Sequence, residues 1–341
     1  MILAGDIGGT NTRLAFFKAA GGGLRPVVEE TLPSREQESL EAAVSRFVSA
    51  HRLPVEGAGF GVPGPVVRGR CEATNLPWVV DARRLARHLG IPGVSLLNDL
   101  EANAYGIPEL SPGDLVPVHP GAPDAVGNAA VIAAGTGLGE AGLFWDGTRH
   151  HPFACEGGHT SFSPTDGTQV RLLQYLLERY EHISWERVLS GPGLHNIYLF
   201  LRDTGGGGEP PWLRDELGRG DPAAVISRAA LEGRSALCAR ALDLLVALYG
   251  SEAGNLALKC MATGGVFVGG GIAPKILPKL QEPGFREAFL AKGRMRRLLE
   301  GIPVRVIVND KTALLGAAHR AALGAGVPAA SEGRNLTARG R

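Results

Sequence analysis

Asp99 is the carboxylate whose position in the chain best suits a catalytic base. It follows Val94–Leu97, an apolar run that predicts a strand. In α/β sheets, side chains at the carboxyl end of a strand face the crevice where ligands bind, and a carboxylate there can accept a proton from a substrate hydroxyl. The same position also suits a helix N-cap before Leu100–Tyr105, and from the sequence alone this alternative stays open.

A mixed set of polar side chains predicts recognition of a sugar. Asn98 precedes the candidate base, Glu156 and His159 enclose a pair of glycines, and Glu186 follows further along the chain. Sugar hydroxyls both donate and accept hydrogen bonds, and a set of Asn, Glu and His side chains matches them. Each residue also has a plain structural explanation, such as a turn with a satisfied histidine or a helix-start acid. Zinc is disfavoured although Cys155 is adjacent, because no Cys or His follows at the spacing of a fourth ligand.

The N-terminal stretch Gly5–Thr12 predicts a loop that holds phosphate. It separates two apolar runs, Ile2–Ala4 and Leu14–Phe17, so the sequence indicates a strand, a tight loop and a second strand. Gly8 and Gly9 can adopt positive φ and carry no Cβ, which lets backbone N–H groups approach a polyanion. The loop lacks the Gly-Lys-Ser/Thr ending of a P-loop, and no helix follows it. An ordinary glycine-rich turn is the alternative.

Three polar side chains of this loop have expected roles. Thr10 and Asn11 add side-chain donors for the phosphate. Asp6 cannot itself favour a phosphate, because both are negatively charged. We therefore expect Asp6 to hold the hydrated Mg²⁺ that accompanies a nucleotide.

The second half of the chain repeats the pattern of the N-terminal stretch. Ala129–Ala133 and Ala141–Trp145 are apolar runs, and the glycine-rich segment Gly135–Gly139 lies between them. An internal repeat of this kind predicts two related α/β domains.

Further elements follow from hydrophobic spacing and capping signals. Ser34–Gln37 has the pattern of a capping box before a helix with Leu40 and Val44 on its apolar face. Asp81 is placed to cap a helix that ends at Gly90. The remaining expected elements are helices at about 168–180 and 221–249, the latter opened by Asp221 and Pro222, strands at Gly264–Val268 and Val304–Val308, and a small-residue helix at Thr312–Leu323.

Composition and charge exclude several classes of protein. The 341 residues are 44% hydrophobic, which suffices for two ordinary domains. The 35 Lys and Arg nearly balance the 34 Asp and Glu, so no net field attracts nucleic acid or an anionic membrane. The four cysteines form no CxxC pair, and neither a basic leader nor a membrane-length apolar run is present. We expect a cytoplasmic protein with a small-molecule partner, binding no nucleic acid and no membrane.

Several motifs, in order over about residues 1–320, resemble the bacterial glucokinase family. One such motif alone would be unspecific, whereas the ordered set is specific. The motifs are Gly5-Asp6-Ile7-Gly8-Gly9-Thr10-Asn11, Leu97-Asn98-Asp99, Gly135-Thr136-Gly137-Leu138-Gly139, Glu156-Gly157-Gly158-His159, Glu186–Gly193 and Gly264–Gly271.

The resemblance implies a fold and an activity. The fold is α/β, a two-domain actin-like (ribonuclease-H-like) ATPase fold with an interdomain cleft. The activity is ATP-dependent phosphorylation of glucose to glucose 6-phosphate. We expect a small domain of residues 1–108 plus about 304–325 and a large domain of residues 109–303. The polar, Arg-rich residues 326–341 are expected to be disordered, and the resemblance also implies a homodimer.

The resemblance also implies a role for each motif. Asp99 acts as the general base on the 6-hydroxyl, and Asn98, Glu156, His159 and Glu186 bind the sugar. ATP with Mg²⁺ lies on the two glycine-rich loops, with later glycines near the adenosine. The implied ATP-binding residues are Gly5, Asp6, Ile7, Gly8, Gly9, Thr10, Asn11, Gly135, Thr136, Gly137, Gly269 and Gly270, with Asp6 toward the Mg²⁺.

One residue departs from the family pattern, and other functions compete. Glu140 stands directly after the second glycine-rich loop, where an apolar residue is expected. A sugar-sensing regulator would need a DNA-binding element, whereas this chain starts at the nucleotide hairpin. A polymerising actin-like ATPase would not need the sugar-binding set. A kinase for another hexose, or one that uses polyphosphate as donor, stays open.

Overall fold

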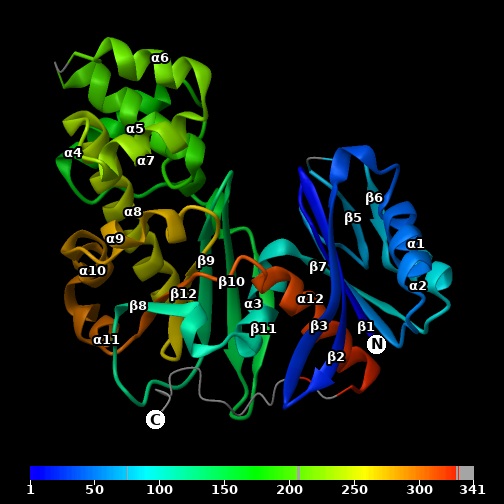
Figure 1. The fold of residues 1–341 in the computed structure, drawn as a ribbon. Coiled ribbons are helices and arrows are strands. Elements are labelled where there is room, and N and C mark those ends of the chain that lie inside the picture. The colour runs from blue at the N-terminus through cyan, green and yellow to red at the C-terminus, as the bar shows by residue number, and fades with distance from the viewer. Residues whose placement is uncertain (75, 206–207, 328, 330–341) are drawn as a thin grey trace. The chain divides into compact units, whose positions relative to one another are not determined.

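A computed structural model of the chain describes residues 1–74, 76–205, 208–327 and 329. They form two compact units (Figure 1). Unit 1 contains Met1–Asp114, Trp145–Ala154 and Asn309–Arg341, and unit 2 contains Leu115–Phe144 and Cys155–Val308. Residues 328 and 330–341, most of the tail expected to be disordered, lie outside the described residues.

Unit 1 is built on a five-stranded sheet in the order β3-β2-β1-β4-β7. β1 (Ile2–Ile7), β2 (Asn11–Ala20) and β3 (Gly23–Pro33) are antiparallel neighbours. β4 (Gly57–Val62) and β7 (Val94–Asn98) run parallel to β1. The strand, loop and strand predicted at the N-terminus are therefore confirmed, and the carboxyl ends of β1, β4 and β7 lie at one edge of the sheet.

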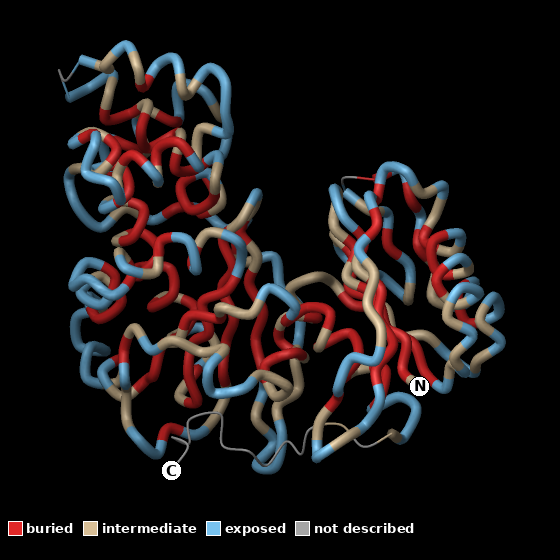
Figure 2. The backbone as a smooth tube through the Cα atoms, in the orientation of Figure 1, coloured by how far each residue is buried: buried red, intermediate tan, exposed pale blue. Residues whose placement is uncertain are grey.

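β1 is almost entirely buried (Figure 2). Side chains of β1 and β2 alternate between the two faces of the sheet and pack there against different helices, as a period of two requires. Leu3 and Phe16 belong to a cluster with α1 (Leu40–His51). Ile2 and Phe17 belong to a cluster with α12 (Thr312–Ala325). The other described elements of this unit are α2 (Ala82–Leu89), α3 (Asp99–Gly106), the small hairpin β5 (Arg70–Glu72) and β6 (Val79–Asp81), and the 3₁₀ turns η1 (Ser34–Glu36), η2 (Ile107–Glu109) and η3 (Pro112–Asp114).

The caps of two helices test the sequence signals. Asp81 accepts a hydrogen bond from the backbone of Arg84, and Gly90 ends α2 with φ 67°, both as predicted. The capping box predicted at Ser34–Gln37 is wrong. Ser39 caps α1 instead, accepting a hydrogen bond from the backbone of Ala42, because the Ser34 side chain is bound elsewhere.

A second sheet has six strands in the order β11-β10-β9-β12-β13-β8. Unit 2 contains β8, β9, β12, β13 and all of β10 except Trp145, whereas the edge strand β11 consists mainly of residues assigned to unit 1. β10 is antiparallel to β9, and β12 and β13 continue the sheet in parallel with β9. This order repeats that of β2, β1, β4 and β7, so the internal repeat predicted from the sequence is confirmed. The strands are β8 (Leu115–His119), β9 (Ala129–Ala134), β10 (Leu138–Trp145), β11 (His150–Cys155), β12 (Gly265–Gly269) and β13 (Val304–Ile307).

A long buried helix, α8 (Ala236–Cys260), packs on this sheet and joins its core. The single helix predicted at 221–249 is wrong, since α7 (Pro222–Leu231) and α8 are separate. Gly233, with φ 67°, interrupts the stretch, and Ser235 caps α8. The other helices are α4 (Gly167–Leu177), α5 (Gly191–Thr204), α6 (Pro211–Arg219), α9 (Leu277–Leu280), α10 (Pro283–Leu290) and α11 (Arg296–Glu300), with 3₁₀ turns η4 (Gly157–His159), η5 (Trp185–Arg187), η6 (Ala273–Ile276) and η7 (Gly293–Met295).

No helix of the described part of the chain has the length and apolar character needed to cross a membrane.

Candidate active site

Two carboxylates of unit 1 lie at the carboxyl edge of its sheet. The register pairs Asp6 of β1 with Gly61 and places Asn98, the neighbour of Asp99, beside Val62. Burial raises the pKa of Asp6 to about 6, Arg13 opposes this rise, and the charges of Asp99 and Asp310 add to it. Asp6 of the loop and Asp99, the candidate base, therefore interact electrostatically within unit 1.

Asp99 is the first residue of α3, and its neighbour supplies the cap. The Asn98 Oδ1 atom accepts a hydrogen bond of 2.8 Å from the backbone N–H of Leu100, and its Nδ2 donates to the Gly64 carbonyl at 3.2 Å. The Asp99 Oδ1 atom accepts from the same N–H at 2.9 Å. Asn98, and not Asp99, is therefore the N-cap of α3. Asp99 accepts a hydrogen bond from the same Leu100 N–H.

The position of α3 is fixed by close contact with α12. Both helices carry glycines where they meet. A Cβ atom at Gly106 would overlap the Thr312 carbonyl oxygen, and one at Gly316 would overlap the Ala102 carbonyl oxygen. Because α3 begins at Asp99, this contact also fixes the backbone of the candidate base.

Ser34 stabilises the hairpin that is predicted to bind phosphate. Within the hairpin, the Gly8 N–H donates to the Asn11 carbonyl at 2.8 Å. The buried Ser34 hydroxyl donates to the Gly8 carbonyl at 2.7 Å and lies 2.9 Å from the Thr12 hydroxyl. Thr10 and Asn11 are exposed at the tip. The sequence pattern predicted a capping role for Ser34. Its contact with the hairpin had no signal in the sequence, because Ser34 is far from Gly8 along the chain.

The backbone conformation and packing of the hairpin glycines differ in part from the prediction. Neither Gly8 nor Gly9 adopts positive φ, so this part of the prediction is wrong. Gly5 is buried in β1, where a Cβ atom would lie 2.5 Å from the Phe60 ring, and Ile7 is buried in the core. Packing therefore accounts for Gly5 and Ile7, while the exposed tip remains available to a ligand.

The glycine-rich turn of unit 2 is shorter than predicted. Gly135–Gly137 connects β9 to β10, and Leu138 already belongs to the strand. The Gly135 carbonyl accepts a hydrogen bond of 2.8 Å from the Gly191 N–H at the start of α5. The Glu186 Oε2 atom accepts one of 2.9 Å from the Leu138 N–H. Glu186, predicted to bind sugar, therefore braces this turn.

The glycines after β12 lie against the same turn. Gly270 has φ 81°, and a Cβ atom there would overlap the Ala134 carbonyl oxygen. The buried Tyr249 hydroxyl accepts from the Ala134 N–H at 3.1 Å and donates to the Gly269 carbonyl at 3.2 Å. Tyr249 thus connects, through hydrogen bonds, the two glycine segments that are predicted to bind ATP. In the sequence, the only sign of this role was a tyrosine among the apolar residues of α8.

The turn from Glu156 to His159 packs on β10 through its glycines. A Cβ atom at Gly158 would overlap the Leu138 carbonyl oxygen. The side chains of Glu156 and His159 are 65% and 62% exposed and lie 4.0 Å apart. The Trp185 N–H donates to the Thr160 carbonyl at 3.0 Å, which connects this turn to the segment of Glu186.

The predicted residues fall into one group in each unit. Within unit 2, Glu186 and the turn from Glu156 to His159 contact Leu138. Gly270 contacts Ala134, the strand partner of Leu138. The group in unit 1 is Gly5, Asp6, Ile7, Gly8, Gly9, Thr10, Asn11, Asn98 and Asp99, and the group in unit 2 is Gly135, Thr136, Gly137, Glu156, His159, Glu186, Gly269 and Gly270.

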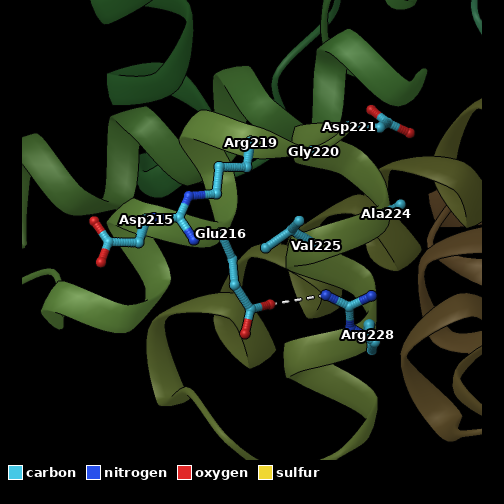
Figure 3. A pocket seen from close by; sticks show the side chains of 8 residues that line it. All are labelled: Asp215, Glu216, Arg219, Gly220, Asp221, Ala224, Val225 and Arg228. Carbon is cyan, nitrogen blue, oxygen red and sulfur yellow. Dashed lines mark hydrogen bonds and ion pairs between the residues drawn. The ribbon is translucent and has the colours of Figure 1, made fainter.

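A surface pocket elsewhere in unit 2 contains none of these residues. It is lined by α6 and α7, and the side chains of Glu216 and Arg228 pair across it at 2.8 Å (Figure 3). Glu216 also pairs with Arg234 at 3.0 Å. Glu216 and Arg228 thus pair with charges of the protein itself, as on a solvated surface.

Comparison of the sequence with known proteins gives matches over nearly the whole chain. A family model described as Glucokinase matches residues 3–323. The glucokinase of Nostoc punctiforme (strain ATCC 29133 / PCC 73102) is 43% identical over 337 residues, covering 94% of this chain and 99% of that protein. The glucokinase of Synechocystis sp. (strain ATCC 27184 / PCC 6803 / Kazusa) is 41% identical over 348 residues, covering 94% and 97%.

Comparison of the structure gives matches of the same kind. The crystal structure of a glucokinase from an Antarctic psychrotroph has a TM-score of 0.84 and 32% identity, covering 94% of this chain and 98% of that one. A ROK family glucokinase from Streptomyces griseus, solved with glucose and AMPPNP, has a TM-score of 0.63 and 22% identity, covering 95% and 99%. The second likeness shows a common fold.

Proposed function

This chain belongs to the glucokinase family, and from that premise we propose that it transfers the γ-phosphoryl group of ATP to the 6-hydroxyl of glucose. The observation that supports this most directly is the arrangement around Leu138. Glu186 and the turn from Glu156 to His159 pack on the residue that directly follows the Gly135–Gly137 turn. Side chains suited to sugar hydroxyls and a turn suited to phosphate are thus built on one backbone segment.

Asp99 is the proposed general base. It accepts the proton of the attacking 6-hydroxyl as the oxygen forms its bond to phosphorus and ADP leaves. Asn98, Glu156, His159 and Glu186 are the proposed sugar ligands.

ATP is the proposed donor, held by the hairpin from Gly5 to Asn11 and by Gly135, Thr136, Gly137, Gly269 and Gly270. Backbone N–H groups of the turns would stabilise the charge that develops on the transferring phosphoryl group.

Asp6 suits a role toward Mg²⁺. Partial burial and the negative charges of Asp99 and Asp310 raise the pKa of its carboxyl group, and a nearby cation would oppose that effect. Among the described residues, no group of three or more His, Cys, Asp or Glu side chains could hold a metal ion. ATP would therefore supply part of the coordination. When bound, Mg²⁺ neutralises phosphate charge in the transition state.

Three further properties belong to the proposal. A homodimer is supported by the resemblance to the bacterial family and is tested by light scattering on the eluting protein. A cytoplasmic location is supported by the absence of paired cysteine motifs. The proposed domains are 1–108 with 304–325 and 109–303. Their boundaries lie within a few residues of the unit boundaries at Asp114 and Asn309, and limited proteolysis tests them.

The activity is tested by coupled ADP release from purified protein with ATP and Mg²⁺. Glucose, mannose, fructose, N-acetylglucosamine and no sugar are compared, and polyphosphate replaces ATP in a parallel series. We expect turnover that requires glucose, ATP and Mg²⁺, and product analysis that identifies glucose 6-phosphate. Binding of sugar without turnover would instead indicate a sensor. Light scattering that rises with ATP in the absence of sugar would indicate a filament-forming ATPase.

A further inference from the structure

Glu140 is a buried acid that the proposed reaction does not use. It stands in β10, two residues after Leu138, and is 1% exposed. Its Oε1 atom has no hydrogen-bond partner among the described residues. Burying a carboxyl group without a partner is unfavourable, and burying it in the ionised form is far more so. Its position therefore calls for a function.

Glu140 forms a pair with a second buried acid, Glu252, which has polar partners of its own. Glu252 of α8 is fully buried, and its Oε1 atom lies 3.1 Å from the Lys259 ammonium group. Its Oε2 atom accepts a hydrogen bond of 2.7 Å from Asn255. The charge of Glu252 in turn raises the pKa of the Glu140 carboxyl group. Glu140, which has no basic partner, is the member that holds a proton.

The other side of the Glu140 carboxyl group faces the sugar-binding turn. A Cβ atom at Gly157 would overlap Oε2 of Glu140, so the backbone of Gly157 lies directly on the carboxyl group. The Cys155 thiol donates to the Glu140 carbonyl at 3.4 Å, on the strand that enters the turn. Glu156 and His159 are mostly exposed. The turn is therefore positioned through its backbone.

We propose that Glu140 is a positioning residue for glucose binding: its protonated carboxyl group, between Glu252 and the backbone of Gly157, holds the turn from Glu156 to His159 in its binding geometry. This rests on the proposed function, since it assigns that turn to glucose. Ionisation of Glu140 would place two carboxylates side by side under the turn, and water would have to enter to solvate them. The turn, which packs on the carboxyl group, would then move.

Glu140 should titrate within a pH range in which glucose binding can be measured. Burial and the negative charge of Glu252 raise the pKa of Glu140 to about 8, against the opposing charge of Lys259. Burial also raises the pKa of the Cys155 thiol above its ordinary value of 9.0, so it stays neutral where Glu140 titrates. The titratable and charged groups around Glu140 are Tyr249, Glu252, Lys259 and Cys260 on α8, Cys155 and Glu156 at the end of β11, and Lys292 before η7.

The test is the pH dependence of glucose binding, measured by calorimetry without ATP from pH 6 to 9. If only the protonated form binds, the dissociation constant of the wild type should rise roughly tenfold between pH 7 and 9. Glu140→Gln keeps a neutral hydrogen-bonding group of the same shape, so it should bind glucose as the wild type does at pH 7 and lack the rise. Cys155→Ala, the matched control, should keep the rise.

Two further variants keep the proposal testable if Glu140→Gln folds poorly. Glu252→Gln removes the negative neighbour, so the rise should begin at lower pH. Gly157→Ala should weaken glucose binding by overlap with the carboxyl group, and adding Glu140→Ala should restore part of that loss. Adding Glu140→Ala to Gly158→Ala should restore nothing, because Gly158 abuts the Leu138 backbone.

The outcomes separate this inference from the proposed function. A wild-type rise that Glu140→Gln retains, or a flat wild-type profile, would overturn the role of Glu140 while glucose-dependent ADP release stands. Absence of glucose binding at every pH would overturn both.

Discussion

The Oε2 atom of Glu186 accepts a hydrogen bond of 2.9 Å from the N–H of Leu138. A side chain proposed to bind sugar thus holds the backbone directly after a turn proposed to bind phosphate. A Cβ atom at Gly137 would lie only 2.5 Å from the same oxygen, so the carboxylate also limits the space around the turn. Changes at Glu186 should therefore affect both substrates.

Glu186→Ala should raise KM for glucose and KM for ATP, each by roughly 10- to 100-fold, because a hydrogen bond to a charged group is lost in both cases. Glu186→Gln keeps an acceptor oxygen for the Leu138 N–H, so it should recover KM for ATP more than KM for glucose. Steady-state kinetics with each substrate varied in turn measures this. Glu181→Gln, an exposed acid nearby, should change neither. An unchanged KM for ATP in Glu186→Ala would contradict the bracing role.

Asp99→Asn should lower kcat by about 10² to 10⁴ with little change in KM for glucose, because it removes a general base. Asn98 still caps α3, so the fold should survive the change. Glu101→Gln removes a carboxylate from the same turn of the helix and serves as the matched control. Rates are measured by ADP release, and circular dichroism checks the fold. Turnover near the wild-type level in Asp99→Asn would remove this residue from the mechanism.

Much of the fold could be predicted because its signals are local. The apolar runs around Gly5–Thr12 and Gly135–Gly139 predicted both hairpins, and their similarity predicted two related α/β domains, whose sheets share a strand order in the structure. The ordered motifs predicted the glucokinase family and its α/β actin-like fold, and the comparisons confirm both. The assignments of individual site residues stay predictions.

What the sequence could not supply depends on contacts distant along the chain. Ser34 and Ser39 both precede α1, and local pattern favours Ser34 as the cap. The structure reverses this because Ser34 binds the Gly8 carbonyl. Glu140 differed from the family pattern, yet nothing local shows that Glu252 and Gly157 enclose it. Gly233 is a sequence signal for the break between α7 and α8. The helical periodicity on both sides of it nevertheless led to the prediction of one continuous helix.

Ser34→Ala should weaken ATP binding and lower stability by about 1–3 kcal/mol, because the Thr12 hydroxyl and the Gly8 carbonyl lose a buried partner. Ser39→Ala is a matched control of similar cost, since removing an N-cap costs about 1 kcal/mol, but it should leave KM for ATP unchanged. Urea unfolding and ATP titration measure the two effects. Equal values of KM for ATP in the two variants would show that Ser34 does not support the hairpin.

Asp6→Asn should stabilise the ligand-free protein more at pH 8 than at about pH 4.5. The pKa of Asp6 is raised from 3.8 to about 6 in the folded state, so folding favours the protonated form. The stability that this form provides is lost as pH rises from about 4 to 6 and stays lost above. The neutral variant avoids a loss of at most about 3 kcal/mol.

Urea unfolding at the two pH values, without ATP or Mg²⁺, measures this difference, with the exposed Asp215→Asn as control. The same Asp6→Asn variant should lose part of the Mg²⁺-dependent affinity for ATP. A stability gain independent of pH would show that Asp6 is not protonated by burial.

Gly316→Ala should lower both stability and kcat. A Cβ atom at Gly316 would overlap the Ala102 carbonyl oxygen and lie 2.6 Å from the Gly106 N atom, so α3 and α12 must separate. Such overpacking costs about 1–3 kcal/mol. Because α3 begins at Asp99, its displacement moves the proposed base, and kcat should fall more than KM for glucose rises.

Gly324→Ala is the matched control on the same helix. Gly324 is exposed, and the nearest atoms to an added Cβ are 3.7 and 3.8 Å away. Replacing a helical glycine with alanine should therefore stabilise the protein by up to about 1 kcal/mol without changing kcat. Thermal unfolding and ADP release measure both variants. If Gly316→Ala lowers stability but leaves kcat at the wild-type level, the contact between α3 and α12 supports the fold without positioning Asp99.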